Sequence, residues 1–162
     1  MNDEKGQLSG EYMLLVGSLI VVLMISIFMI ANENELNIAM AAAKSGADEG
    51  VASSSSAIYP KETFNEYDDR EGLKHPYSVS IVNVSYNSSG IDENYGKQKI
   101  QFKVYAKASV DYNKKELDSI GDRINYNLRK SVATSFNTTD STNKLYNPVF
   151  SNNYVFTTAN VV

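Results

Sequence analysis

An uncharged apolar run, Tyr12–Ala31, constrains the fold of this 162-residue chain more than any other feature. Within it, only Gly17, Ser18 and Ser26 are not apolar. A helix of that length rises about 30 Å, which is the thickness of the hydrocarbon core of a bilayer. The apolar residues cover every side of such a helix, so we expect the segment to be surrounded by lipid or by partner helices.

Three interpretations of the run differ in what happens to it after synthesis. A core helix of a soluble protein seldom has this length. A cleaved secretory signal would end at a small-x-small site, Ala39–Ala41 or Ala41–Ala43, and the mature chain would begin near Ala42 or Lys44. Its N-terminal segment Asn2–Lys5 is net acidic and its apolar region too long, so a retained helix fits better.

The helical pattern continues beyond the run. Apolar residues recur at three- and four-residue steps, namely Leu36, Ala39, Met40, Ala43, Ala47 and Val51. No proline precedes Pro60, so we predict one helix over residues 7–57, about 75 Å long. Its second half carries small residues, including Gly46 and Gly50, at which neighbouring segments can approach closely.

Seven residues, Lys5-Gly6-Gln7-Leu8-Ser9-Gly10-Glu11, stand directly before the run. Glu11 places a carboxylate beside a membrane-length segment, and a charge at mid-bilayer costs about 3 kcal/mol, less near the interface. The helix dipole favours an acid in a first turn, which is the simple explanation of Glu11. An intramembrane charge is more often functional, and Gly6 offers an unhindered, flexible position for cleavage.

Lys5-Gly6, followed by Gln7-x-Ser9-x-Glu11 and the apolar run, resembles the class III signal peptide of euryarchaeal type IV pilins, the major pilins of methanogens in particular. The resemblance covers the N-terminal third of the chain. It implies that a membrane aspartyl prepilin peptidase cuts between Gly6 and Gln7. It also implies a structural subunit that an assembly platform adds to a surface filament of identical copies, used for attachment.

After such a cleavage, residues 1–6 are a leader and Glu11 is the fifth mature residue. We expect Glu11 to pair with the new α-amino group of Gln7, on its own or an adjacent subunit, and so to set the axial register. Cyclisation of Gln7 to a lactam would remove that amine. Lys5 precedes the run and the next basic residue is Lys44, which favours a cytoplasmic N-terminus and an extracellular head.

Residues 58–162 predict an α+β head with an antiparallel sheet and one packed helix. Alternation over residues 77–86, with a slip at Val82-Asn83, and over 100–112 indicates two strands joined by a loop, Asn87–Lys97. Segments 146–150 and 154–162 indicate a closing hairpin.

A capping box, formed by Asn113 and Glu116, predicts the start of the packed helix. An apolar stripe follows at helical steps, namely Leu117, Ile120, Ile124, Leu128 and Val132. We therefore predict a helix from Lys114 to about Ser135, with this stripe against the sheet.

Three sequons, beginning at Asn83, Asn87 and Asn137, are candidate N-glycosylation sites if the head lies outside the cell. We expect Asn87 and Asn137 in loops and Asn83 on or beside a strand. The alternative is that these asparagines support turns.

Other features exclude several classes of function. There is no cysteine, hence no disulfide or thiolate metal site. The net charge is −4 and the basic residues are scattered along the sequence, so we expect no nucleic-acid surface. The acidic cluster Glu66–Glu71 lacks the spacing of a calcium loop, and His75 is the only histidine. We therefore predict no catalytic residue, no metal site, no cofactor and no enzyme activity.

Two other functions remain compatible with the sequence. One is a single-pass, membrane-anchored surface protein whose head binds a ligand without polymerising. The other is a minor pilin or pseudopilin that does not form the bulk of a filament.

Overall fold

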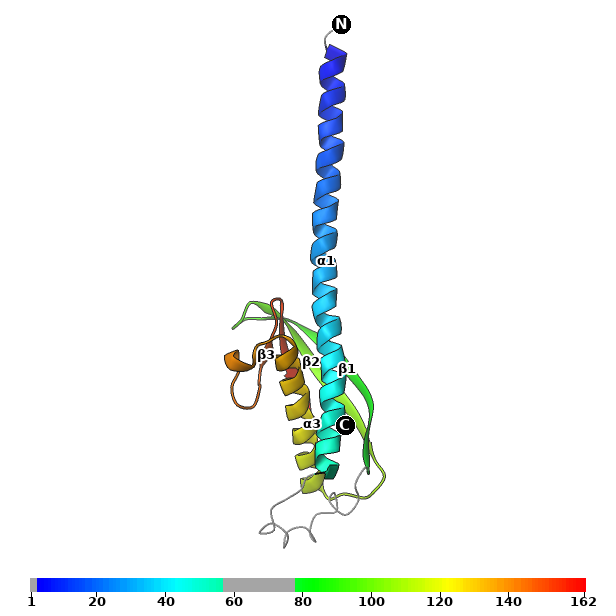
Figure 1. Ribbon diagram of the computed structural model, residues 1–162, viewed down its shortest axis with the longest axis vertical. Coiled ribbons are helices and arrows are strands. Elements are labelled where there is room, and N and C mark those ends of the chain that lie inside the picture. The colour runs from blue at the N-terminus through cyan, green and yellow to red at the C-terminus, as the bar shows by residue number, and fades with distance from the viewer. Residues whose placement is uncertain (1–2, 57–77) are drawn as a thin grey trace. The chain divides into compact units, whose positions relative to one another are not determined.

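The computed structural model describes residues 3–56 and 78–162, with side chains over 10–53 and 78–162 (Figure 1). The described elements are, in chain order, α1 (Asp3–Ser56), β1 (Val79–Asp92), β2 (Lys97–Ala108), α3 (Lys114–Ser135), the 3₁₀-helix η2 (Thr139–Ser141), β3 (Val149–Phe150) and β4 (Tyr154–Thr158). The predicted α+β class is confirmed. The chain divides into two compact units, residues 1–36 and 37–162. The predicted boundary between residues 57 and 58 lies outside the described residues.

The long N-terminal helix is α1, and it begins at Asp3, before the predicted start at Gln7. No proline interrupts it. Inside the apolar run, the Ser18 hydroxyl donates to the Leu15 carbonyl and the Ser26 hydroxyl to the Val22 carbonyl, both at 2.8 Å. These bonds satisfy the hydroxyls within the helix itself, which suits a surface surrounded by lipid or apolar side chains.

The second unit contains a four-stranded sheet with the order β1-β2-β4-β3 in the described residues. β1 pairs with β2 and β3 with β4 in antiparallel fashion, as predicted. β2 and β4 are parallel, so the sheet is mixed and the prediction of a wholly antiparallel sheet was wrong in this pair. The physical reason is the connection: α3 lies between β2 and β4 in the chain and supplies the long crossover that a parallel pair needs.

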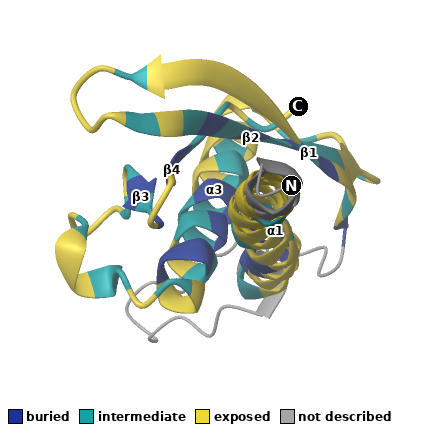
Figure 2. Cartoon of the chain, turned by 90° about the horizontal axis from the view of Figure 1, so that it is seen from above, coloured by how far each residue is buried: buried dark blue, intermediate teal, exposed yellow. Residues whose placement is uncertain are grey.

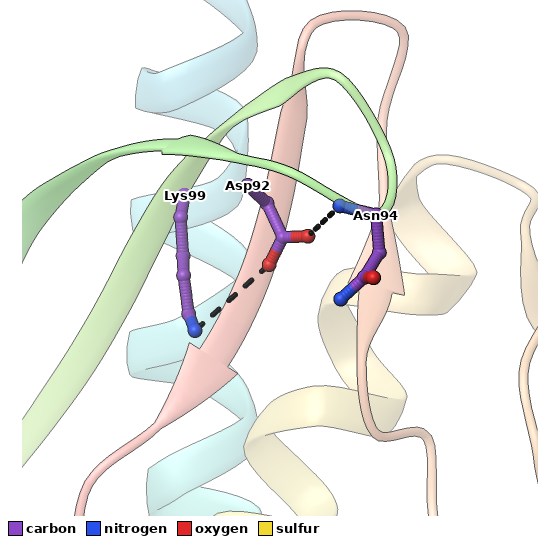
Figure 3. Close-up of polar contacts among 3 residues, drawn as sticks. All are labelled: Asp92, Asn94 and Lys99. Carbon is purple, nitrogen blue, oxygen red and sulfur yellow. Dashed lines mark hydrogen bonds and ion pairs between the residues drawn. The ribbon is translucent and has the colours of Figure 1, made fainter.

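The predicted slip in β1 is present as a change of register between Ile81 and Asn83. The predicted loop Asn87–Lys97 is too long, however, because β1 continues to Asp92 and β2 begins at Lys97. Asp92 organises the short turn that remains. Its carboxylate accepts the Asn94 N–H at 3.0 Å, and Lys99 Nζ lies 3.9 Å from its other oxygen (Figure 3).

Helix α3 has the predicted bounds and the predicted capping box. The Glu116 N–H donates to Asn113 Oδ1 at 3.0 Å, and the Asn113 N–H donates to Glu116 Oε2 at 3.1 Å. Its buried apolar side chains include Ile124, Leu128 and Val132. Leu117, predicted at the start of the stripe, is instead 48% exposed, because the first turn of α3 extends past the core.

Within the second unit, α1 packs against α3 through small residues. Its buried residues recur at helical steps, namely Ala39, Ala42, Ala43, Gly46, Ala47, Gly50 and Val51. A Cβ on Gly46 would lie 2.6 Å from the Asn127 carbonyl oxygen, and one on Gly50 would lie 2.7 Å from Ile124 Cα. The two glycines therefore let the helix backbones approach more closely than any side chain allows. The small residues that we expected to admit neighbouring segments admit α3 of the same chain.

The core lies between the sheet and the helices (Figure 2). Phe156 stacks on Phe102 and on Phe136, with ring centroids 5.6 and 5.7 Å apart. Full burial of an aromatic or branched aliphatic side chain contributes about 1.5–3 kcal/mol relative to exposure. Beyond β4 the chain stays on β2, since the N–H groups of Ala159 and Val162 donate to the carbonyls of Phe102 and Val104.

Candidate functional site

The N-terminal motif lies on α1. Residues Lys5, Gly6, Gln7 and Ser9 have helical backbone, and their side chains lie outside the described set. Glu11 is exposed, one residue before the apolar run. Around Gly10 and Gly17 the described chain leaves open space, because a Cβ on either would meet nothing within 4 Å. No described segment therefore covers the helix at Gly10, within the motif, or at Gly17, within the apolar run.

The apolar run is exposed on all sides. Its large described side chains from Tyr12 to Ile30 are 51% to 76% exposed, Val16 apart. Soluble monomers rarely expose contiguous apolar patches larger than a few hundred Å². A helical surface of this size needs lipid, detergent or other helices around it.

Two of the candidate glycosylation sites share one side of the sheet. Asn83 lies opposite Tyr105 and Asn87 opposite Gln101, and both asparagines are exposed. Asn83 follows the bulge, which agrees with its predicted place on or beside a strand. Asn87 is in β1 and not in a loop as predicted, because the strand runs on through the polar stretch Asn87–Gly90.

Asn137 lies apart from the other two, two residues after the end of α3. Its φ of 53° is left-handed, a conformation that asparagine tolerates better than most residues. Its N–H donates to the Thr134 carbonyl and the Thr138 N–H to the Ala133 carbonyl, the two bonds of a Schellman motif. Asn137 therefore ends the helix, and its exposed side chain stays accessible for modification.

Sequence reasoning missed a row of lysines on β2. Because side chains alternate in a strand, Lys97, Lys99, Lys103 and Lys107 all point to the face opposite Ile100, Phe102 and Val104, which are buried against the helices. Counting basic residues along the chain made them look scattered. All four have odd residue numbers, so they share one face of a strand, and this pattern could have revealed the row.

Arg129 is the described group with a shifted pKa. Burial lowers the pKa of its guanidinium below the ordinary value, and the negative charge of Asp122 acts in the opposite direction. The guanidinium donates to the Leu145 carbonyl at 3.1 Å and to Thr158 Oγ1 at 2.5 Å. These bonds tie the segment after α3 to β4, which is a structural role.

No group of three or more metal-ligating side chains occurs among the described residues. The acidic cluster Glu66–Glu71 and His75, both considered from the sequence, lie outside the described residues. What the described surface offers is a helix with an exposed apolar surface, three accessible sequons and a basic face.

Comparison with protein-family models, with curated proteins and with solved structures finds no match to this chain. The architecture itself is a long apolar N-terminal helix followed by a small β-sheet domain. This is a pilin-like architecture.

The apolar helix also bears on location. Gly10–Ser53 of α1 contains a segment long and apolar enough to cross a membrane. Such a helix suggests a membrane-anchored or secreted protein.

Proposed function

We propose that this chain is the precursor of a structural subunit of an archaeal type IV pilus-like filament that attaches cells to surfaces. The observation that carries the proposal is the apolar run of α1, exposed on all sides directly after the Lys5–Glu11 motif. A membrane anchor alone accounts for the apolar residues. It does not account for Glu11, whose charge costs energy at the edge of the span.

Cleavage between Gly6 and Gln7 is the first step. The bond lies in the first turns of α1, where N–H groups lack helical partners and the helix frays readily. Gly6 weakens the helix there by about 1 kcal/mol relative to alanine. A membrane peptidase therefore has little structure to unwind before it reaches the bond.

Assembly is the second step. The apolar run exchanges lipid for the helices of neighbouring subunits as the assembly platform inserts each copy. Glu11 pairs with the α-amino group of Gln7, and this pair sets the axial register. The head stands outside the cell, where Asn83, Asn87 and Asn137 accept N-glycans. The chain needs no cofactor or metal and is not an enzyme.

The intact mass of the native protein and electron microscopy of the same preparation test the proposal together. We expect a mature chain that begins at Gln7, with added mass from glycans, and filaments in the images. A chain that begins near Ala42 or Lys44 would instead indicate a secreted protein. Dispersed subunits at high concentration, with α1 intact, would overturn polymerisation.

Replacing Glu11 tests the register. Glu11→Ala should still be cleaved and inserted, because neither step uses the carboxylate, but filament yield should fall at least about tenfold if an ion pair near the apolar phase is lost. Glu33→Ala is the matched control, since Glu33 is an exposed acid on the same helix beyond the run. Normal filament yield from Glu11→Ala would remove the pairing from the proposal.

A single-pass surface protein that binds a ligand as a monomer is the second candidate. The head favours it in one respect, because residues 37–162 have their own buried core and a row of lysines on one face of β2. A minor pseudopilin is a variant of the first candidate. Microscopy separates both of these alternatives from the proposed filament subunit, since neither of them forms the bulk of a filament.

A further inference from the structure

The outward side of β1 and β2 forms a polar surface, here called the lysine face. It consists of Lys99, Gln101, Lys103, Tyr105 and Lys107 on β2 and of their neighbours Ser80, Asn83, Ser85 and Asn87 on β1. The pairing register places Lys103 beside Ser85 and Lys107 beside Ser80. Among the described elements, α3 and the α1 segment of this unit lie on the other side of the sheet (Figure 2).

The charged side chains of the lysine face are all positive, except at the end of the face that lies beside the turn between β1 and β2. There Asp92 lies 3.9 Å from Lys99, and the Asp92 side chain is mostly buried. The other acidic residues described in the second unit lie on α1, on α3 or in connecting segments, namely Asp48, Glu49, Glu93, Asp111, Glu116, Asp118, Asp122 and Asp140. A chain of net charge −4 thus keeps a basic strip on one side of its sheet.

The spacing of the strip is regular. Lys99, Lys103 and Lys107 are four residues apart, so their Cα atoms follow one another at about 13 Å along the strand. Between them lie Gln101 and Tyr105, and Lys103 Nζ stands 5.1 Å from the centroid of the Tyr105 ring. Amide and hydroxyl groups on β1 flank the row from Gln101 to Lys107.

We propose that the lysine face binds an acidic polysaccharide, a linear chain of sugars that carry carboxylates. The ammonium groups pair with the carboxylates, while the Gln101 amide, the hydroxyls of Ser80 and Ser85 and the Tyr105 ring meet the sugar hydroxyls and ring faces. This deepens the proposed function, on which it rests for the outward placement of the head: it names what the filament attaches to. The interaction is electrostatic at each site and falls with added salt.

The composition of the face favours this partner over two others. Nucleic-acid surfaces use arginine forks for phosphates and several aromatic rings for bases, and the lysine face has no arginine and one ring. A second copy of the chain would need an acidic surface to match, but the exposed residues of α3 include Lys114, Lys115 and Lys130 beside Asp118 and Asp122. Neutral hydrogen-bonding groups interleaved with well-spaced cations suit a carboxylated sugar chain.

Repetition would strengthen a weak site. In a filament of identical subunits the lysine face recurs along the fibre, and a polymer that occupies one face holds its next segment close to another. Such linkage can raise the overall affinity about 10²–10⁴-fold over a single site. A modest affinity of the dispersed subunit is therefore expected and sufficient.

Binding to immobilised polygalacturonate tests the inference, with dextran as the neutral surface. The full-length protein is used as dispersed subunits in detergent, from a host without N-glycosylation. Lys103→Gln with Lys107→Gln should weaken binding about tenfold or more, since each substitution removes a positive charge that faces the anionic polymer. Lys114→Gln with Lys115→Gln is the matched control, because both lysines are exposed at the start of α3 and carry the same charge. It should change binding less than about twofold.

Several results would overturn the inference. They are equal loss in both double variants, equal binding to dextran, or stronger competition by duplex DNA than by free polygalacturonate. Lys103→Arg with Lys107→Arg should keep binding, and failure there while the thermal unfolding curve is unchanged would contradict a charge-based site. The native glycosylated protein should bind too, and its failure would overturn the inference, because glycans on Asn83 or Asn87 would then cover the face in the protein as it occurs. None of these readouts requires polymerisation, so a chain that binds without forming filaments would contradict the proposed function alone.

Discussion

Two segments of α1 differ in how far their side chains are buried and in which residues are buried. From Tyr12 to Ile30 the large apolar side chains are at least half exposed around the whole helix, apart from Val16. From Ala39 to Val51 the buried residues form one narrow stripe of alanine, glycine and a single valine. Gly17 in the first segment has open space around it, whereas Gly46 in the second lies directly against α3.

The difference shows where each segment finds its partner. The second segment has a partner within the chain, and its small residues are shaped to α3. The first has none among the described residues, although its apolar surface is much larger. The hydrophobic effect then requires a partner from outside the described residues. Under the proposed function, lipid and then the helices of other subunits would be these partners.

The largest expected difference comes from two leucines, one on α3, which is the partner of the second segment, and one in the first segment. Leu128→Ala removes a fully buried side chain of α3 and should destabilise the second unit by about 3 kcal/mol. The midpoint of thermal unfolding in detergent should fall by roughly 10 °C. Leu23→Ala, in the apolar run, should leave that midpoint unchanged, because Leu23 is 54% exposed in the subunit.

Filaments give the second half of this test. In the proposed filament the Leu23 side chain would pack against neighbouring subunits, so Leu23→Ala should lower the temperature at which the fibre dissociates. A fall in the head's unfolding midpoint from Leu23→Ala would instead show that the apolar run already has a partner within its own chain.

A pair of glycines should give the next largest difference. Gly46→Ala places a methyl group 2.6 Å from the Asn127 carbonyl oxygen, so α1 and α3 must separate, and we expect a loss of about 1–3 kcal/mol. Gly17→Ala meets nothing in the described chain and should leave the unfolding midpoint of the subunit unchanged. Unfolding monitored by circular dichroism reports both. Equal losses would show that the Gly46 contact is not specific.

Local patterns predicted much of the fold. The capping box of Asn113 and Glu116 and the stripe that follows it gave the bounds of α3, because side-chain caps and helical periodicity act over a few residues. The slip at Val82-Asn83 predicted the bulge, since alternation breaks where a residue is inserted. The apolar run of α1 was evident from length and composition alone.

The errors share a physical cause, which is that some structure depends on partners distant in the sequence. β1 continues past Tyr86 through residues that are exposed, so no buried side chain marked the strand, and pairing with β2 maintains it. The parallel pairing of β2 with β4 depends on how α3 crosses the sheet. The role of Gly46 and Gly50 was recognised as close approach, but their partner could not be named before α3 was placed.

The candidate sites divide in the same way. The Lys5–Glu11 motif was found from its residues, and the structure adds only that it is helical and that Glu11 is exposed. The lysine face was missed because the lysines form a row only when it is known which residues of β2 point to the same face. Its neighbours on β1, Asn83 and Asn87, were found as sequons, and the pairing register with β2 then placed them on the same face.

The smallest expected difference concerns the start of α3, the partner that distinguishes the two segments of α1. Asn113→Ala removes the side-chain acceptor for the Glu116 N–H and should cost about 1 kcal/mol, lowering the unfolding midpoint by a few degrees. Asn34→Ala is the matched change on α1 in the first unit, where an exposed helical asparagine gains helix propensity as alanine. It should not lower the midpoint. If Asn34→Ala destabilised the head as much as Asn113→Ala, the first unit would contribute to the stability of the second. The contrast between a segment with its partner inside the chain and one with no partner among the described residues would then have to be abandoned.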